Sequence, residues 1–182
     1  MLFRSTLHGI AAATARGTRR VTGVTAQGIT ACPCAQELVA ASATRNLEGE
    51  GFDAGEIERI LQAVPVATHN QRGLGSLYIG CPEECGEEFD AASLLAIVED
   101  SMSSEIYELM KRSDEGHVVE KAHRRPRFVE DCVREAIRMA VDEYAPLGDG
   151  VFVMSRQENL EDRKSTRLNS SHSGESRMPS SA

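Results

Sequence analysis

Two short motifs place possible metal ligands in the first half of the chain. They are CPCAQ, residues 32–36, and THNQRG, residues 68–73. Thiolate and neutral imidazole are the side chains that best hold a borderline metal such as zinc or ferrous iron. The motifs therefore predict a metal-dependent enzyme, with Cys32 or Cys34 and His69 as ligands. The alternative is two small buried cysteines and an ordinary solvated loop histidine.

Groups that could hold an anion lie close to these motifs in the sequence. Asn70, Gln71 and Arg72 follow His69 directly and can donate hydrogen bonds to an anionic or purine-like ligand. A dense basic run occupies residues 123–127 (HRRPR) and begins with His123. Local basic groups of this kind can bind a phosphate, although a solvated helix start explains the same residues.

Two carboxylates are further candidates. Glu105 lies inside a predicted long helix and near its apolar side, where an unpaired carboxylate costs several kcal/mol. It therefore needs a cationic partner or a metal. Glu120 follows a predicted turn in SDEGHVVE and offers two acceptor oxygens to a ligand. Both can also be plain surface acids in so acidic a chain.

A structural zinc site is the competing hypothesis from another class of protein. The five cysteines have uneven spacing, which favours reduced thiols or metal ligands over a disulfide framework. Cys32, Cys34, Cys81 and Cys85 together could hold zinc through four thiolates in a non-catalytic module. Their C-x-C and C-x3-C spacings differ from the usual zinc-knuckle pattern.

The elements that must position these residues follow from hydrophobic periodicity and capping signals. We expect strands at 19–30, 75–80 and 151–155, and helices at 36–47, 54–63, 90–110 and from Pro126 to about 140. The His69 loop falls between the second helix and the second strand. This order predicts an α+β fold in which two long helices pack on one face of an antiparallel sheet.

Composition limits the possible partners. The 182 residues are 41% hydrophobic and carry a formal net charge of −8, which argues against a nucleic-acid backbone as partner. No apolar run approaches the roughly 20 residues that span a bilayer, and residues 1–20 lack a signal-peptide pattern. We therefore expect a cytoplasmic protein without a membrane partner.

The composition changes abruptly at residue 162. Residues 162–182 are rich in Ser, Arg and Asn, so this segment is expected to stay disordered. DRKSTRLNSSH, residues 162–172, resembles a translated sequencing adapter, and SRMPSSA, residues 176–182, resembles its downstream end. We therefore treat residues 19–161 as the folded domain and residues 1–18 as an N-terminal remnant.

Four motifs in order, CPCAQ, THNQRG, SSEIYELMKRSDE and EKAHRRPRFVEDCVRE, resemble the type IB GTP cyclohydrolases, most closely the archaeal branch of the methanopterin pathway. The resemblance covers roughly residues 19–161. It implies a tunnelling fold, with this chain as the C-terminal half of a tandem pair. It also implies hydrolysis of GTP at C8 with release of formate, giving a dihydroneopterin cyclic phosphate, as the first step of pterin synthesis.

The resemblance also implies residue roles and partners. Cys32, His69 and Glu105 match metal-site positions, with one ferrous ion per subunit, or zinc or manganese in its place. Cys32 and His69 would also be catalytic. Glu120 matches the carboxylate that anchors guanine, and His123 is expected to support phosphate binding. We assign Arg72 to substrate binding as well, and Cys34 to local structure.

One departure from the family pattern concerns the end of the domain. The family continues into a further metal-site histidine, whereas here QENLE, residues 157–161, runs into the adapter-like tail. We therefore expect a truncated chain, which assembles as a homodimer or larger oligomer when full length. Another pterin or purine enzyme of the same fold remains an alternative.

Overall fold

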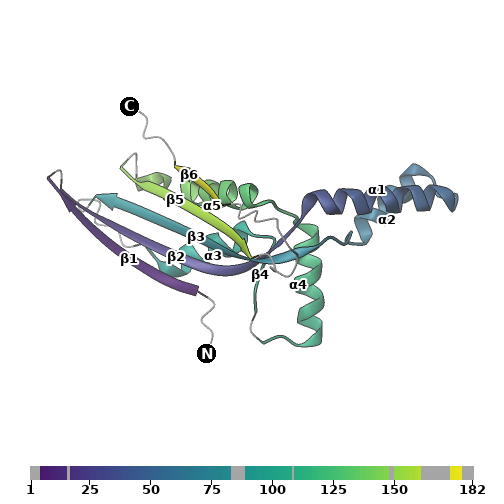
Figure 1. Ribbon diagram of the computed structural model, residues 1–182, viewed down its shortest axis with the longest axis horizontal. Helices are drawn as coiled ribbons and strands as arrows, with labels where there is room; N and C mark the ends of the chain where they lie inside the picture. The colour runs from purple at the N-terminus through teal and green to yellow at the C-terminus, as the bar shows by residue number, and fades with distance from the viewer. Residues whose placement is uncertain are drawn as a thin grey trace, which may run out of the picture.

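The computed structural model describes residues 5–15, 17–82, 89–107, 109–147, 150–160 and 173–177. Its centre is an antiparallel sheet with the strand order β1, β2, β3, β5, β6, while the short β4 pairs with β2 (Figure 1). The strands are β1 (Ser5–Thr14), β2 (Gly17–Ala31), β3 (Asn70–Pro82), β4 (Ser104–Glu105), β5 (Phe152–Leu160) and β6 (Ser173–Arg177).

The helices serve three different purposes. They are α1 (Pro33–Gly49), α2 (Ala54–Ala63), α3 (Ala91–Ser101), α4 (Arg112–Arg124) and α5 (Val129–Tyr144), which runs into the 3-10 turn η2 (Ala145–Leu147). α3 and α5 cover one face of the sheet. α1 and α2 project from one end of the sheet as an arm, and α4 lies near the base of that arm (Figure 1). The predicted α+β architecture of the tunnelling type is confirmed.

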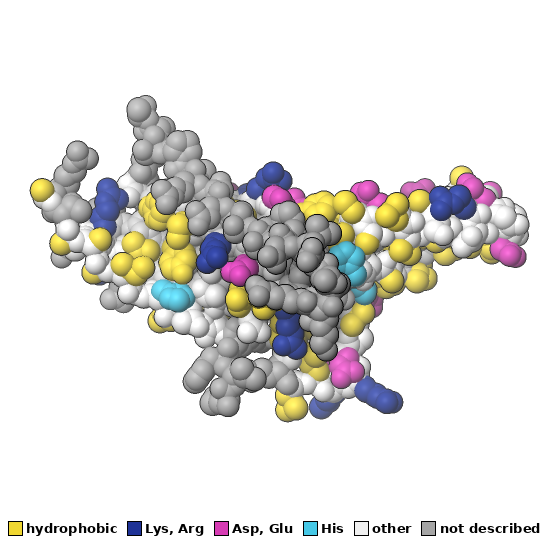
Figure 2. Space-filling view, in the orientation of Figure 1, with side chains coloured by type: hydrophobic (Ala, Val, Ile, Leu, Met, Phe, Trp, Pro, Cys, Tyr) yellow, Lys and Arg dark blue, Asp and Glu magenta, His cyan; other side chains and the backbone are white. Residues whose placement is uncertain are grey.

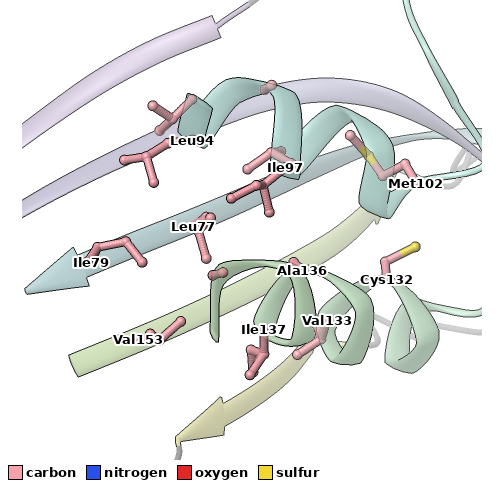
Figure 3. Close-up of a cluster of buried hydrophobic side chains, with 14 residues drawn as sticks. Leu77, Ile79, Leu94, Ile97, Met102, Cys132, Val133, Ala136, Ile137 and Val153 are labelled. Carbon is pink, nitrogen blue, oxygen red and sulfur yellow. The ribbon is translucent and has the colours of Figure 1, made fainter. Parts of the chain in front are cut away.

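The hydrophobic core lies between the sheet and the two covering helices (Figure 3). Leu77 and Ile79 on β3 are completely buried, as is Leu94 on α3. α5 contributes the apolar side that its sequence period predicts, with Val133, Ala136 and Ile137 among its buried residues. Cys132 belongs to the same cluster, and burial raises the pKa of its thiol to about 12. It therefore packs as a small apolar side chain.

Of the two arm helices, α1 is longer at both ends than the predicted 36–47, since it spans Pro33–Gly49. α2 spans Ala54–Ala63 as predicted, and its capping box is present: the Asp53 Oδ1 accepts from the Glu56 N–H at 2.8 Å, and the Glu56 Oε2 accepts from the Asp53 N–H at 3.0 Å. α1 contains no buried residue. Hydrophobic side chains therefore remain visible along the arm (Figure 2).

The treatment of residues 1–18 as a remnant is wrong for residues 5–14. These form β1, which pairs with β2 from Ser5 opposite Ala26 to Thr14 opposite Gly17. Gly17 makes the tight turn between them with φ 115°, a conformation that favours glycine. The strand was missed because Gly9 and the three alanines at 11–13 carry little β-propensity. Pairing with the long β2 supplies the order instead.

The predicted long helix over 90–110 is also wrong in its second half. α3 ends at Ser101, and Glu105 lies in β4, antiparallel to β2. Ser101, Ser103 and Ser104 interrupt the helix because serine competes for backbone hydrogen bonds. The Ser101 Oγ donates to the Val98 carbonyl at 2.7 Å, and the Ser103 N–H donates to the Ile29 carbonyl at 3.0 Å. Leu109, expected on the apolar side of that helix, is 94% exposed.

Glu120 lies within a helix rather than after a turn, and His123 lies in the last turn of the same helix rather than at a helix start. α4 spans Arg112–Arg124, a helix that the sequence analysis did not predict. Its Gly116 and its mostly charged composition hide the helical period, although Asp114 and Glu115 in the first turn and Lys121, His123 and Arg124 in the last turn suit a helix dipole.

The tail contains one further difference. Ser173–Arg177, inside the segment expected to stay disordered, forms β6 against β5, with Ser155 opposite Ser176. An extended segment can satisfy the backbone groups of an open sheet edge without apolar side chains, because main-chain hydrogen bonds suffice. Residues 161–172 and 178–182 lie outside the described residues. The adapter origin of the tail stays a prediction.

Candidate functional site

Two hydrogen bonds join the two motifs that predict metal chemistry. β2 delivers Cys32 to the start of α1, where Pro33 occupies the first helical turn. The Cys32 N–H donates to the His69 carbonyl at 3.0 Å, and the Thr68 Oγ1 donates to the Cys32 carbonyl at 2.7 Å. The loop before β3 is therefore fixed to the end of β2. His69 lies in this loop, between α2 and β3, as predicted.

The end of α4 meets the same place. The His123 Nε2 lies 3.2 Å from the Thr68 carbonyl oxygen, and the Gln36 Nε2 donates to the carbonyls of Val66 and His123. We call this set the motif junction; its members are Cys32, Gln36, Val66, Thr68, His69 and His123. Histidine side chains are visible at the base of the arm, above α4 (Figure 2).

The residue before Cys32 is braced from two other elements. The Ala31 N–H donates to the Ser103 Oγ at 3.0 Å, and the Ala31 carbonyl accepts from the Arg127 N–H at 2.9 Å. The Arg127 guanidinium donates in turn to the Ser101 carbonyl at 2.6 Å, at the end of α3. These hydrogen bonds restrict the backbone at the end of β2. Because Cys32 follows Ala31 directly, its backbone position is restricted as well.

Glu105 occupies a separate ion pair. Lys121 on α4 donates to its Oε2 at 2.5 Å, and the Tyr107 hydroxyl donates to its Oε1. Burial of the carboxyl raises its pKa, but these hydrogen bonds outweigh burial and lower the pKa of Glu105 to about 2. Glu105 is therefore a carboxylate at any ordinary pH.

Strand register separates Arg72 from Glu105. Glu105 lies opposite Gly28, which lies opposite Gly73, and directly paired residues share a face of the sheet. Successive residues of a strand alternate between faces, so Arg72 lies on the other face from Glu105. Its side chain is exposed there. The structure therefore does not bring Arg72 together with Glu105.

Glu120 lies on the exposed side of α4. The Arg124 Nε donates to its Oε1 at 2.9 Å, and both side chains are largely exposed. The two other nitrogens of the Arg124 guanidinium donate to the carbonyls of Gln62 and Ala63 at 3.1 Å each. Arg124 therefore attaches the end of α2 to α4 and orients Glu120.

The predicted metal shell fits these residues only in part. A thiol and an imidazole are the right donors for iron(II) or zinc, and the motif junction holds their backbones together. Glu105 is engaged with Lys121 instead. Within the described ranges, no three His, Cys, Asp or Glu side chains are grouped so that they could hold a metal ion. The metal site stays a prediction, with Cys32 and His69 as its best-supported part.

The four-thiolate zinc site is wrong for its described members. Ala31, next to Cys32, pairs with Asn70 at the start of β3, whereas Cys81 pairs with Arg20 near the opposite end of the strand. At roughly 3.3 Å per residue, this separation is on the order of 30 Å. Cys81 is also fully buried. Cys85 lies outside the described residues.

Sequence reasoning missed the residues that organise the site. Lys121, Ser103 and Arg127 act across distances of 16 to 96 positions in the chain, through contacts to Glu105 and Ala31. The sequence marks Gln36 only as the end of CPCAQ and the start of a predicted helix, with no sign of its two distant carbonyl partners. A signal was available for Lys121 alone, because a half-buried carboxylate at Glu105 requires a cationic partner.

No helix in the described part of the chain is long and apolar enough to cross a membrane.

Known proteins are similar to this chain over nearly the whole of residues 1–161. Residues 3–161 match the family described as type I GTP cyclohydrolase folE2. The chain is 48% identical over 143 residues to GTP cyclohydrolase MptA of Methanococcus aeolicus, covering 79% of this chain and 46% of the relative. It is 42% identical over 142 residues to GTP cyclohydrolase MptA of Methanocaldococcus jannaschii, covering 78% of this chain and 45% of the relative.

The chain thus spans about half the length of the curated relatives that it matches. The family match begins at residue 3 and so includes β1, which agrees with the place of β1 in the sheet. It ends at residue 161, where the change in composition was noted. The matched range contains both joined motifs, and this chain belongs to the type I GTP cyclohydrolase folE2 family.

Proposed function

We propose that this chain is part of a GTP cyclohydrolase that releases C8 of GTP as formate and yields a dihydroneopterin phosphate for pterin synthesis. One observation carries the proposal: inside the matched range, the hydrogen bond from the Cys32 N–H to the His69 carbonyl and that from the Thr68 Oγ1 to the Cys32 carbonyl hold the CPC and HNQR motifs together at the motif junction. Two water molecules react in turn at C8: the first opens the imidazole ring to a formamide as one C8–N bond breaks, and the second cleaves the other C8–N bond, so that C8 leaves as formate with both added oxygens.

Cys32 and His69 are the proposed ligands of one iron(II) ion per subunit, with zinc or manganese as substitutes. A bound divalent cation would act as a Lewis acid and make water a better nucleophile at neutral pH. Glu105 is the proposed third ligand. Because Lys121 already holds its carboxylate, a cation would compete with Lys121 for the same oxygens.

The substrate side of the proposal rests on α4. Glu120 presents a carboxylate to the guanine edge, oriented by Arg124, and His123 at the last turn supports phosphate. Arg72 is exposed on the other face of the sheet, so we propose it for substrate binding only from a second subunit. The assembly would be a homodimer or larger oligomer in the cytoplasm, with this chain as the C-terminal half of a tandem pair.

Cys32→Ser should abolish iron-dependent formate release, because serine is a poor ligand for iron(II) where a thiolate is required. The measurement is formate produced from GTP without oxygen, with and without added ferrous iron. The matched control is Cys34→Ser, two residues away and exposed, which should keep its activity and iron content.

Equal iron binding by the Cys32→Ser variant and the unchanged chain would contradict this ligand assignment. GTP turnover without formate would indicate another purine or pterin reaction on the same fold.

A further inference from the structure

Gln36 bridges two separate segments of the chain through one nitrogen atom. It lies in the first turn of α1, four residues after Cys32. Its Nε2 donates to the Val66 carbonyl at 2.8 Å and to the His123 carbonyl at 2.5 Å. A primary carboxamide has two N–H groups to donate, and this arrangement uses both.

Both acceptors belong to segments that carry candidate site residues. Val66 lies three residues before His69, in the loop whose His69 carbonyl accepts from the Cys32 N–H. His123 lies in the last turn of α4, and its ring contacts the Thr68 carbonyl. α4 also carries Lys121, which holds Glu105.

We propose that Gln36 is a positioning residue that keeps α4 in register with the Cys32 and His69 pair. Its side chain is the contact that joins α1 to both the His69 loop and the end of α4. Together with the His123 contact to the Thr68 carbonyl and the Lys121–Glu105 ion pair, it helps to set the spacing between the thiol and imidazole on one side and the carboxylates of α4 and β4 on the other. The metal-binding part of this inference rests on the proposed function; the coupling of the segments does not.

The chemistry of this position suits glutamine in particular. Glutamate has almost the same shape, but its carboxylate would face two carbonyl oxygens and could donate to neither. Asparagine keeps both donors on a side chain that is one methylene shorter. Gln36→Glu therefore removes both hydrogen bonds of the bridge while changing the side-chain volume very little. Gln36→Asn keeps the donors but weakens the bridge, because the shorter side chain reaches the two carbonyls less well.

The first experiment measures amide hydrogen exchange without added metal. Gln36→Glu is expected to speed exchange by about tenfold in the last turn of α4, which corresponds to about 1.4 kcal/mol of local stability. Exchange in the segment 66–69 should rise as well. Glu37→Gln is the matched control: it makes the reverse change at the next residue, which is exposed, and should leave both segments unchanged.

Unchanged exchange at the end of α4 in Gln36→Glu would overturn the proposal. Gln36→Asn should show the same pattern to a smaller extent. Loss of the helical circular dichroism signal in both Gln36 variants would also contradict it, because a positioning residue should not determine whether the domain folds.

The second experiment titrates cobalt(II) and follows the thiolate-to-cobalt absorption band. Gln36→Glu is expected to bind cobalt about tenfold more weakly than the unchanged chain, and Glu37→Gln equally well. Equal affinity in Gln36→Glu, with faster exchange at α4, would overturn the link to the metal pair. A missing cobalt band in the unchanged chain would count against the proposed metal site, while the exchange result would still decide whether Gln36 couples the segments.

Discussion

Replacing Leu77 with alanine is expected to lower the free energy of unfolding by about 3 kcal/mol. Leu77 is fully buried on β3, between the sheet and the two covering helices (Figure 3). The change removes buried apolar surface and leaves a cavity that the neighbouring strands cannot easily fill. Urea denaturation followed by circular dichroism measures the effect.

The sheet itself supplies a matched control. Leu7 on β1 lies opposite Val24 on β2, which lies opposite Leu77 on β3, so all three side chains share one face. Leu7 is nevertheless 62% exposed, because α3 and α5 do not extend over β1. Leu7→Ala should change stability by no more than about 0.5 kcal/mol. A cost as large as that of Leu77→Ala would mean that this face of β1 is covered in solution.

Capping residues and apolar periodicity correctly predicted the helices whose formation depends on neighbouring residues in the sequence. The box of Asp53 and Glu56 located the start of α2 to the residue, and the apolar period of α5 identified its buried side. Both features act over three or four positions, which is the range that a sequence pattern can report. The core residues on α5 could therefore be predicted from the sequence.

Elements that depend on distant partners could not be predicted in this way. β1 has weak strand propensity and is ordered by pairing with β2. β4 is only two residues long, and it pairs with β2 at Gly28 and Ile29, past the last described β1 pair at Ala26. Apolar periodicity instead favoured a helix through Glu105, and the tertiary pairing overrides it.

In the candidate site, too, the features set by neighbouring residues could be predicted, and those that depend on distant partners could not. The residue types in CPCAQ and THNQRG pointed to a shared site, and the hydrogen bond from Cys32 to His69 places the two motifs together. Their supports, Gln36 and Lys121, act across 87 and 16 positions respectively. Polar side chains of this kind look like ordinary surface residues until the fold brings their partners near.

Lys121→Met is expected to destabilise the domain by about 2 kcal/mol at neutral pH, because it leaves the half-buried Glu105 carboxylate without its cation. The free energy of unfolding, measured in urea at several pH values without added metal, tests this. Lys111→Met is the matched control: it removes the same charge next to the same helix, at an exposed residue, and should cost no more than about 0.5 kcal/mol.

The difference between Lys121→Met and the unchanged chain should also depend on pH in a defined direction. The folded pKa of Glu105 is about 2, below its ordinary value of 4.5, so its ion pair stabilises the fold above pH 4.5. As the pH falls from 4.5 towards 2, the carboxyl is protonated first in the unfolded chain and then in the folded one, and that stabilisation is lost. In Lys121→Met, the hydrogen bond and charge of Lys121 no longer oppose burial, so the pKa of Glu105 should rise from its value in the unchanged chain. The two curves of unfolding free energy against pH should therefore converge in acid.

A difference in unfolding free energy that stays constant from neutral pH down to pH 2 would contradict this. It would show that Lys121 stabilises the fold through packing of its methylenes rather than through Glu105.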